Sequence, residues 1–412
     1  MAKLTLNSIS PSIFVVNAED TADKTQARAD IVAAGRNLFY EHARKGQRAM
    51  RTALNSTEPV APEYVTAAQY NELNKAFQVS HLLYAAQKYC AFTGEAAPET
   101  FEEFKRMSQN LYGKQGFYAI LQGIYQEIIT PILPAVYSEA VSLFSDTVEV
   151  GFGETYAVSV GSNDIPIFQD SAWGSARSVP ANRFYDKDYT LNPQPKTAEI
   201  RMKWTQLVGN NTDFGRFFAN IVAGMYAKTM GIWNAAMIAA ASDPKLIPSG
   251  LTVTYSNLNW VTLANKLAAV NNTGIGNLIA TGNAVALSKV LPTQVGGSTN
   301  VNMDAAIATL LGADYTRAGY LGEYMSVRLL PQTDAVVPGT QNTTVQTILD
   351  SSKVWMLAGN GRKPMTIGYN RDTPLSIEIS PKKTASFEMI FNLTMALDSV
   401  AIFASKVGLV NI

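Results

Sequence analysis

The sequence is poor in charged residues and has no excess of either sign. Its 412 residues include 33 lysine and arginine and 33 aspartate and glutamate residues, so the formal net charge is zero and only 16% of the chain is charged. A disordered chain would need low hydrophobicity and high net charge, and a general nucleic-acid-binding protein would need an excess of basic residues. The composition excludes both classes. Because little charge repels a second copy, it favours self-association.

Residues that perform catalysis or bind metals are also scarce. The single cysteine, Cys90, cannot form an internal disulfide, and we expect it to be a buried thiol in a reducing compartment. The two histidines, His42 and His81, have no second histidine at metal-ligand spacing, and no phosphate-binding glycine loop or G-x-S-x-G nucleophile motif occurs. We therefore expect no enzyme activity, no metal and no cofactor. A soluble enzyme with an unrecognised carboxylate site is one alternative.

Long uninterrupted apolar runs are missing as well. The most apolar window, 214–241, contains Lys228 and has a sided pattern, so we expect no membrane span. The first ten residues lack the basic and apolar regions of a secretory signal, so we expect none.

The first 146 residues predict a helical region. Apolar residues spaced by threes and fours predict helices over 22–51, 62–77, 79–92 and 98–111, and a further apolar run covers 118–144. The densest basic cluster of this region comprises Arg44, Lys45, Arg48 and Arg51. Such a cluster is typical of a solvated helix end, and it is also a candidate contact to nucleic acid.

The period changes to two between residues 147 and 206. Alternate apolar residues from Val148 to Val160 predict one long strand, and a similar alternation over 198–204 predicts its partner. The connection between them, about 35 residues long, is too long for an ordinary loop in a compact domain. We therefore predict an extended two-stranded arm.

The rest of the chain alternates helices and strands. Residues 214–241, preceded by the capping side chains of 211–213, predict one helix roughly 42 Å long. Further helices are predicted over 258–270, 284–291 and 303–311, with strands over 278–281, 325–330 and 354–358. The last strands are predicted over 365–369, 375–379 and 387–397, followed by a turn at Asp398–Ser399 and a strand over 400–403. This pattern predicts an α+β fold.

The order of these elements resembles that of the major capsid protein of tailed bacteriophages, the Johnson or Hong Kong 97-type fold. Short phrases also fit, namely NLIATGN at 277–283, VWMLAGNG at 354–361 and VGLV at 407–410. The resemblance implies five segments: a helical N-terminal region (1–146), an extended E-loop hairpin (147–206), the spine helix of a peripheral domain (207–249), an axial domain (250–360) and closing strands shared by both domains (361–412).

The resemblance also implies a function. It predicts a capsid protein whose hexamers and pentamers form the icosahedral head shell around double-stranded DNA, located in the virion after assembly in the bacterial cytoplasm. Portal, scaffolding and cement proteins would be its further partners, with no membrane. An encapsulin-type compartment shell, which has the same fold around a cargo enzyme, is the alternative.

Two sets of charged residues are candidate sites in such a shell. The contacts between subunits are predicted to join arm residues to residues near the C-terminal strands: Asp170, Arg177, Arg183, Asp186 and Lys187 with Arg362, Lys363, Arg371 and Asp372. The residues predicted to face packaged DNA, through its phosphates alone, are Arg44, Lys45, Arg48, Arg51, Lys382 and Lys383.

Overall fold

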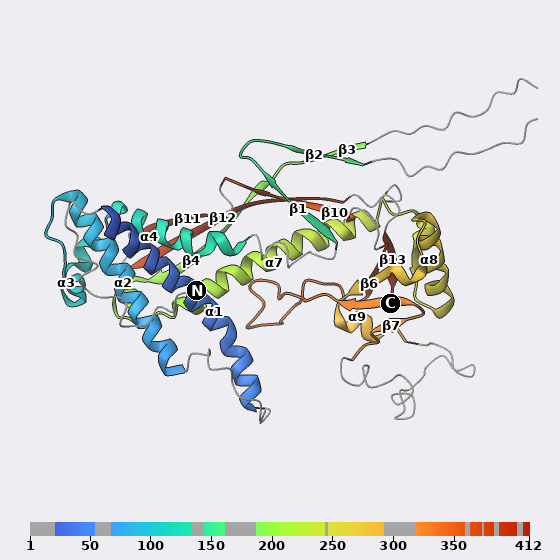
Figure 1. Ribbon diagram of the computed structural model, residues 1–412, viewed down its shortest axis with the longest axis horizontal. Helices are drawn as coiled ribbons and strands as arrows, with labels where there is room; N and C mark the ends of the chain where they lie inside the picture. The colour runs from blue at the N-terminus through green and yellow to red at the C-terminus, as the bar shows by residue number, and fades with distance from the viewer. Residues whose placement is uncertain are drawn as a thin grey trace, which may run out of the picture. The chain divides into compact units, whose positions relative to one another are not determined.

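A computed structural model of the chain describes residues 21–53, 67–133, 144–160, 187–243, 246–291, 319–358, 363–372, 375–382, 387–401 and 407–412 (Figure 1). Within these ranges the side chains of 21–25, 43–53, 160 and 187 are not described. The chain forms two compact units, each built from separate stretches: unit 1 comprises 1–136, 195–225 and 372–396, and unit 2 comprises 137–194, 226–371 and 397–412.

Helices form one layer of unit 1. They are α1 (Thr21–Ala53), α2 (Ala67–Thr93), α3 (Phe101–Leu111) and α4 (Gln115–Ile129), then a 3-10 turn (Thr130–Ile132) and the short α6 (Trp204–Val208). α1, α2 and α4 pack against one another. Gly35 of α1 allows this close approach, because a Cβ atom there would overlap Cδ1 of Ile128 on α4. The guanidinium of Arg28 on α1 donates two hydrogen bonds to the carboxylate of Glu127 on α4, from Nε to Oε2 at 3.1 Å and from Nη2 to Oε1 at 2.7 Å.

The 28-residue helix α7 (Phe214–Ala241) begins in unit 1. Its first turn is capped by Asp213, whose Oδ1 accepts the backbone N–H of Arg216 at 3.0 Å. Phe214 and Phe218 of this helix contact the ring of Phe77 on α2, with centroids 5.3 and 6.1 Å apart. An aromatic core therefore joins the start of α7 to the helical layer.

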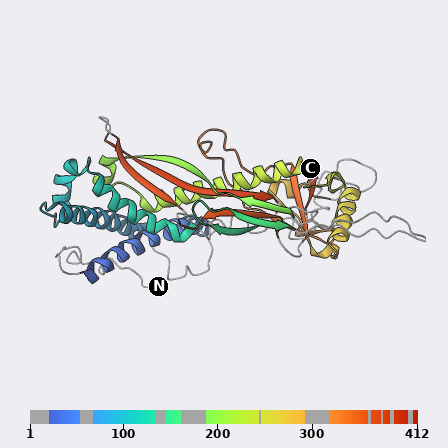
Figure 2. The same ribbon diagram turned by 90° about the horizontal axis from the view of Figure 1, so that it is seen from above.

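The sheet of unit 1 consists of β4 (Gln194–Lys203), β11 (Ser376–Lys382) and β12 (Glu388–Ala401). β11 and β12 are antiparallel, with Ser376 opposite Thr394 and Lys382 opposite Glu388, and β4 also pairs with β12. Figure 2 shows the red strands β11 and β12 beside the green β4. Alternate residues of β11 and β12 are buried, and α4 packs on β11, so one face of the sheet is covered by the helical layer.

Unit 2 contains a six-stranded sheet in the order β5-β13-β9-β6-β8-β7. Its strands are β5 (Thr252–Thr254), β13 (Val407–Asn411), β9 (Lys353–Ala358), β6 (Leu278–Gly282), β8 (Val327–Pro331) and β7 (Glu323–Tyr324), with helices α8 (Asn257–Val270) and α9 (Ala284–Ser288). Two 3-10 turns span Ser249–Leu251 and Ile275–Asn277. Trp233, Trp260 and Met356 are fully buried in the core of this unit.

Two smaller strand groups complete unit 2. β1 (Ser145–Val150) pairs in parallel with β10 (Met365–Asn370), and β10 pairs with Leu397–Ala401 at the end of β12. β2 (Tyr156–Val160) and β3 (Lys187–Leu191) form a separate antiparallel pair.

The α+β class is confirmed, as are the long helix at 214–241, the helix at 258–270 and the strands at 278–281 and 354–358. Two separate helices over 62–77 and 79–92 were wrong, because α2 runs unbroken through Gln78. The polar Gln78 is buried and donates its amide N–H to the carbonyl of Leu207, so it does not interrupt the helix. The predicted helix at 303–311 lies outside the described residues, and the division into five segments stays a prediction.

Three strand predictions also need correction. The strand over 148–160 is broken after Val150, where Gly153 adopts a φ of 76°. The second half of this stretch, β2, pairs with β3 and not with the predicted partner over 198–204. Most of that predicted partner is β4, which pairs with β12, and Trp204 begins α6. There is no turn at Asp398–Ser399, because β12 continues to Ala401 and Oδ2 of Asp398 accepts the N–H of Asn192 at 2.8 Å.

Candidate subunit interface

The β2–β3 pair forms a narrow ribbon with two different faces. The register places Tyr156 opposite Leu191 and Val158 opposite Tyr189, so all four lie on one face. Val158 and Leu191 are buried against Val400 of β12. The opposite face carries exposed Ala157, Ser159, Asp188 and Thr190. Among the described residues no third strand joins this ribbon.

A tight turn between β1 and β2 presents an aromatic side chain to solvent. The N–H of Glu154 donates to the carbonyl of Gly151 at 3.1 Å, and Gly153 supplies the positive φ that such a turn requires at its third residue. Phe152, the second residue of the turn, is 81% exposed. The sequence placed Phe152 on the buried face of one long strand; the two flanking glycines were the signal for a turn.

Most of the predicted arm contacts lie outside the described residues. These are Asp170, Arg177, Arg183 and Asp186, together with Arg362. Lys187 is the first residue of β3, opposite Val160, and its side chain is not described.

Lys363 and Arg371 flank the buried strand β10 at its two ends. The ammonium group of Lys363 lies 3.6 Å from Oδ1 of Asp146 and 3.3 Å from the carbonyl of Ser145, at the start of β1. The backbone N–H of Arg371 donates to the carbonyl of Val150, at the end of β1. Both residues therefore fix β10 to β1 within the chain. Asp372 follows directly and belongs to unit 1.

Lys382 lies at the tip of the β11–β12 hairpin in an aromatic setting. Its ammonium group is 3.7 Å from Oε2 of Glu388. The hydroxyl of Tyr112 is 2.7 Å from the Lys382 carbonyl and 2.9 Å from the Glu388 carbonyl, and its ring contacts Trp204 and Phe387. Lys382 thus has a carboxylate partner, and Lys383 lies outside the described residues.

The basic cluster Arg44, Lys45, Arg48 and Arg51 lies in the second half of α1. The backbone there is helical, as predicted, and the side chains are outside the described set.

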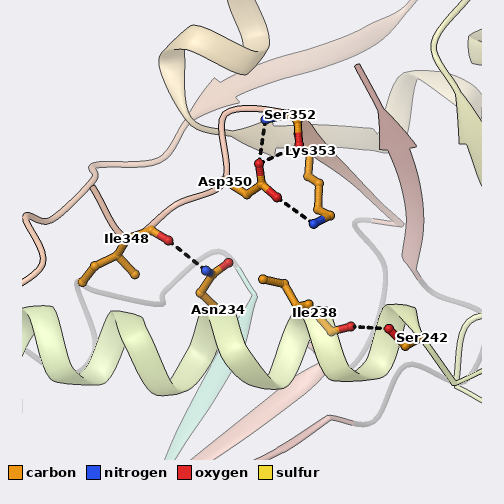
Figure 3. A network of polar contacts seen from close by, with 7 residues as sticks. All are labelled: Asn234, Ile238, Ser242, Ile348, Asp350, Ser352 and Lys353. Atoms are coloured by element: carbon orange, nitrogen blue, oxygen red, sulfur yellow. Dashed lines mark hydrogen bonds and ion pairs between the residues drawn. The ribbon is translucent and has the colours of Figure 1, made fainter. Parts of the chain in front are cut away.

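Unit 2 also contains a charged network that the sequence analysis missed (Figure 3). The carboxylate of Asp350 accepts hydrogen bonds from Ser352 N–H at 2.9 Å, Ser352 Oγ at 2.6 Å and Lys353 Nζ at 2.6 Å. Burial acts to raise the pKa of Asp350, but the bonds from Lys353 and Ser352 outweigh it and lower this pKa to about 2. Asn234 of α7 holds the neighbouring carbonyl of Ile348 at 2.8 Å. The start of β9 is therefore fixed.

His81 is fully buried in unit 1. Its Nδ1 lies 2.6 Å from the carbonyl of Phe77 and so carries the proton, which leaves Nε2 to accept the hydroxyl proton of Tyr125 at 3.0 Å. Burial lowers the pKa of His81 to about 4, although the hydrogen bond to the Phe77 carbonyl acts to raise this pKa. A neutral imidazole is therefore part of the core.

The described ranges hold neither a metal-binding cluster nor a membrane-spanning helix. No three histidine, cysteine or carboxylate side chains gather there as they would around a metal ion. None of the helices in these ranges is long and apolar enough to cross a membrane.

No protein-family model and no curated protein matches the chain. Among solved structures it is similar to the capsid of a native gene transfer agent (GTA) particle, with 13% identity over 67% of this chain and 90% of that chain and a TM-score of 0.42. It is also similar to the mature capsid of bacteriophage PhiM1, with 10% identity over 65% of this chain and 85% of that chain and a TM-score of 0.39. A virus-like particle from Pyrococcus furiosus is similar with 10% identity over 67% of this chain and 96% of that chain and a TM-score of 0.35. These likenesses concern the fold, and the proposed function rests on the geometry of this chain.

Proposed function

We propose that this chain is a major capsid protein that assembles into the icosahedral head shell of a tailed bacteriophage and encloses double-stranded DNA. The observation that carries the proposal is the β2–β3 ribbon, a two-stranded sheet with one face packed on Val400 of β12 and the other face exposed. A partner surface on the exposed face would add to the stability of this two-stranded ribbon. Because the chain is weakly charged, a second copy is the partner that it suits best.

The arm charges test how copies would meet. In this proposal Asp170, Arg177, Arg183, Asp186 and Lys187 of one copy pair with Arg362, Lys363, Arg371 and Asp372 of the next. Arg183→Glu should then lower the fraction of chain that sediments as shells, while the matched reversal Lys228→Glu, at an exposed position of α7, should not. Normal shells from Arg183→Glu would count against the pairing.

The contents of the shell distinguish a virus from a compartment. If Arg44, Lys45, Arg48, Arg51, Lys382 and Lys383 face DNA, alanine variants of these residues should retain less DNA as salt is raised, because each phosphate contact releases counterions. Nuclease-protected DNA inside shells would support the capsid. Shells that hold a protein cargo and no DNA would support the compartment instead.

A further inference from the structure

The outward face of α8 carries exposed apolar side chains next to polar ones. Its inward side buries Trp260, Leu263 and Leu267 in the core of unit 2. On the other side Leu258 is 77% exposed and Val270 44% exposed, with the small or polar Thr262, Asn265 and Ala269 between them. Lys266 is the only charged residue of the helix. Leu258 therefore adds a large apolar side chain to the side of the helix that faces away from the core.

The start of this helix is held firmly, so the exposure of Leu258 is not the result of a frayed end. The side chain of Ser256 caps α8 by accepting the N–H of Asn259 at 3.1 Å. The hydroxyl of Tyr324 on β7 donates to Oδ1 of Asn257 at 2.7 Å. Leu258 is therefore presented from a fixed position on a rigid element.

The turn that carries Phe152 has complementary properties. It presents one exposed aromatic ring, followed two residues later by the exposed carboxylate of Glu154. Within the described part of the chain no basic side chain pairs with Glu154, and Lys266 of α8 has only the carbonyl of Gly250, 3.2 Å away, as a partner. Phe152 and Leu258 are both exposed in the same chain, so they do not cover each other within it.

We propose that the Phe152 turn of one copy docks on the outward face of α8 of a second copy, with Glu154 facing Lys266. This contact rests on the proposed function and names one of its interfaces. It is heterologous, because two different surfaces meet, so it can be repeated around a closed ring. The apolar pair provides burial, and the opposite charges select the register.

A charge swap tests the register. Lys266→Glu and Glu154→Lys should each lower the fraction of chain in shells several-fold, measured by sedimentation velocity, and the double variant should recover most of it. Lys228→Glu, a reversal at an exposed position of α7, is the matched control and should assemble normally. Single variants that assemble like the unmodified chain, or a double variant no better than the singles, would overturn the proposal.

Cross-linking tests the contact without disturbing the charges. Cys90 is buried, so the double variant Phe152→Cys, Leu258→Cys adds the only accessible thiols among the described residues. A short bismaleimide should convert its shells to covalent dimers and longer chains, whereas Phe152→Cys with Val285→Cys on α9 should give few. Shells without such products overturn this contact and leave the proposed function standing. If the unmodified chain forms no shells at all, both fail.

Discussion

The hydroxyl of Tyr70 on α2 donates a hydrogen bond of 2.6 Å to Oδ1 of Asp213, the same oxygen that caps the first turn of α7. Burial, and then the neighbouring Asp213 carboxylate, raise the pKa of Tyr70 far above its ordinary value, so the phenol remains a proton donor. One carboxylate thus joins the helical layer of unit 1 to the start of α7.

Removing this hydroxyl should weaken unit 1. Tyr70→Phe leaves the Asp213 carboxylate without one of its donors, and hydrogen bonds to charged groups contribute about 2 kcal/mol. We expect the free energy of unfolding, measured in urea, to fall by roughly that amount. Tyr40→Phe, at a half-exposed tyrosine of α1, is the control and should change the free energy of unfolding little. An equal loss of stability in both variants would contradict this role for Tyr70.

Two glycine-to-alanine changes should have opposite effects. At Gly35 the new Cβ meets Ile128 and Phe77, so Gly35→Ala should destabilise the chain by about 1 to 3 kcal/mol. At Gly224 in α7 nothing lies within 4 Å, so Gly224→Ala should stabilise it by about 0.5 to 1 kcal/mol through helix propensity. Thermal denaturation of both variants would check the signs. A stable Gly35→Ala variant would mean that α1 and α4 do not approach so closely.

The buried imidazole of His81 should make unit 1 sensitive to acid. The folded chain binds its proton with a pKa of about 4 and the unfolded chain with one of 6.5, so acid between these values favours unfolding. The stabilisation is complete above pH 6.5 and falls by on the order of 3 kcal/mol as the pH approaches 4. His81→Gln should flatten this part of the stability profile. An unchanged profile in His81→Gln would exclude this explanation.

Asp350 should act in the same direction in a lower pH range. Its pKa is about 2 in the folded chain against an ordinary 3.8, so the stabilisation from its ionised carboxylate is present above 3.8 and is lost as the pH falls toward 2. Asp350→Asn should therefore lower the melting temperature at pH 7 and have little effect near pH 2. Glu323→Gln, at the exposed residue of β7, is the matched control. Equal effects at both pH values would mean that the charge is not what stabilises this network.

Regular periodicity predicted much of the fold. The apolar residues of α7 and α8 recur every three or four positions, and those of β11 and β12 every second position, because one face of each element is buried. Where an element buries one face and exposes the other, its sequence is enough to predict its type and approximate bounds.

The failures arise where tertiary contacts replace local signals. A polar residue such as Gln78 between two apolar runs predicts a helix break, yet the distant Leu207 carbonyl accepts a hydrogen bond from its side chain. The pair Asp398–Ser399 predicts a turn, yet Asp398 accepts the N–H of Asn192 from another part of the chain. The surfaces of the candidate interface were the least predictable, because the exposure of Phe152 and Leu258 depends on how the whole of unit 2 folds.

Imaging the purified chain by negative-stain electron microscopy tests the central claim most directly. The proposed capsid function predicts closed shells of uniform size, or sheets and tubes with the same subunit spacing, formed by this chain without an added enzyme or cofactor. Single compact particles of one or two chains, at the same concentration and over a range of salt, would contradict it.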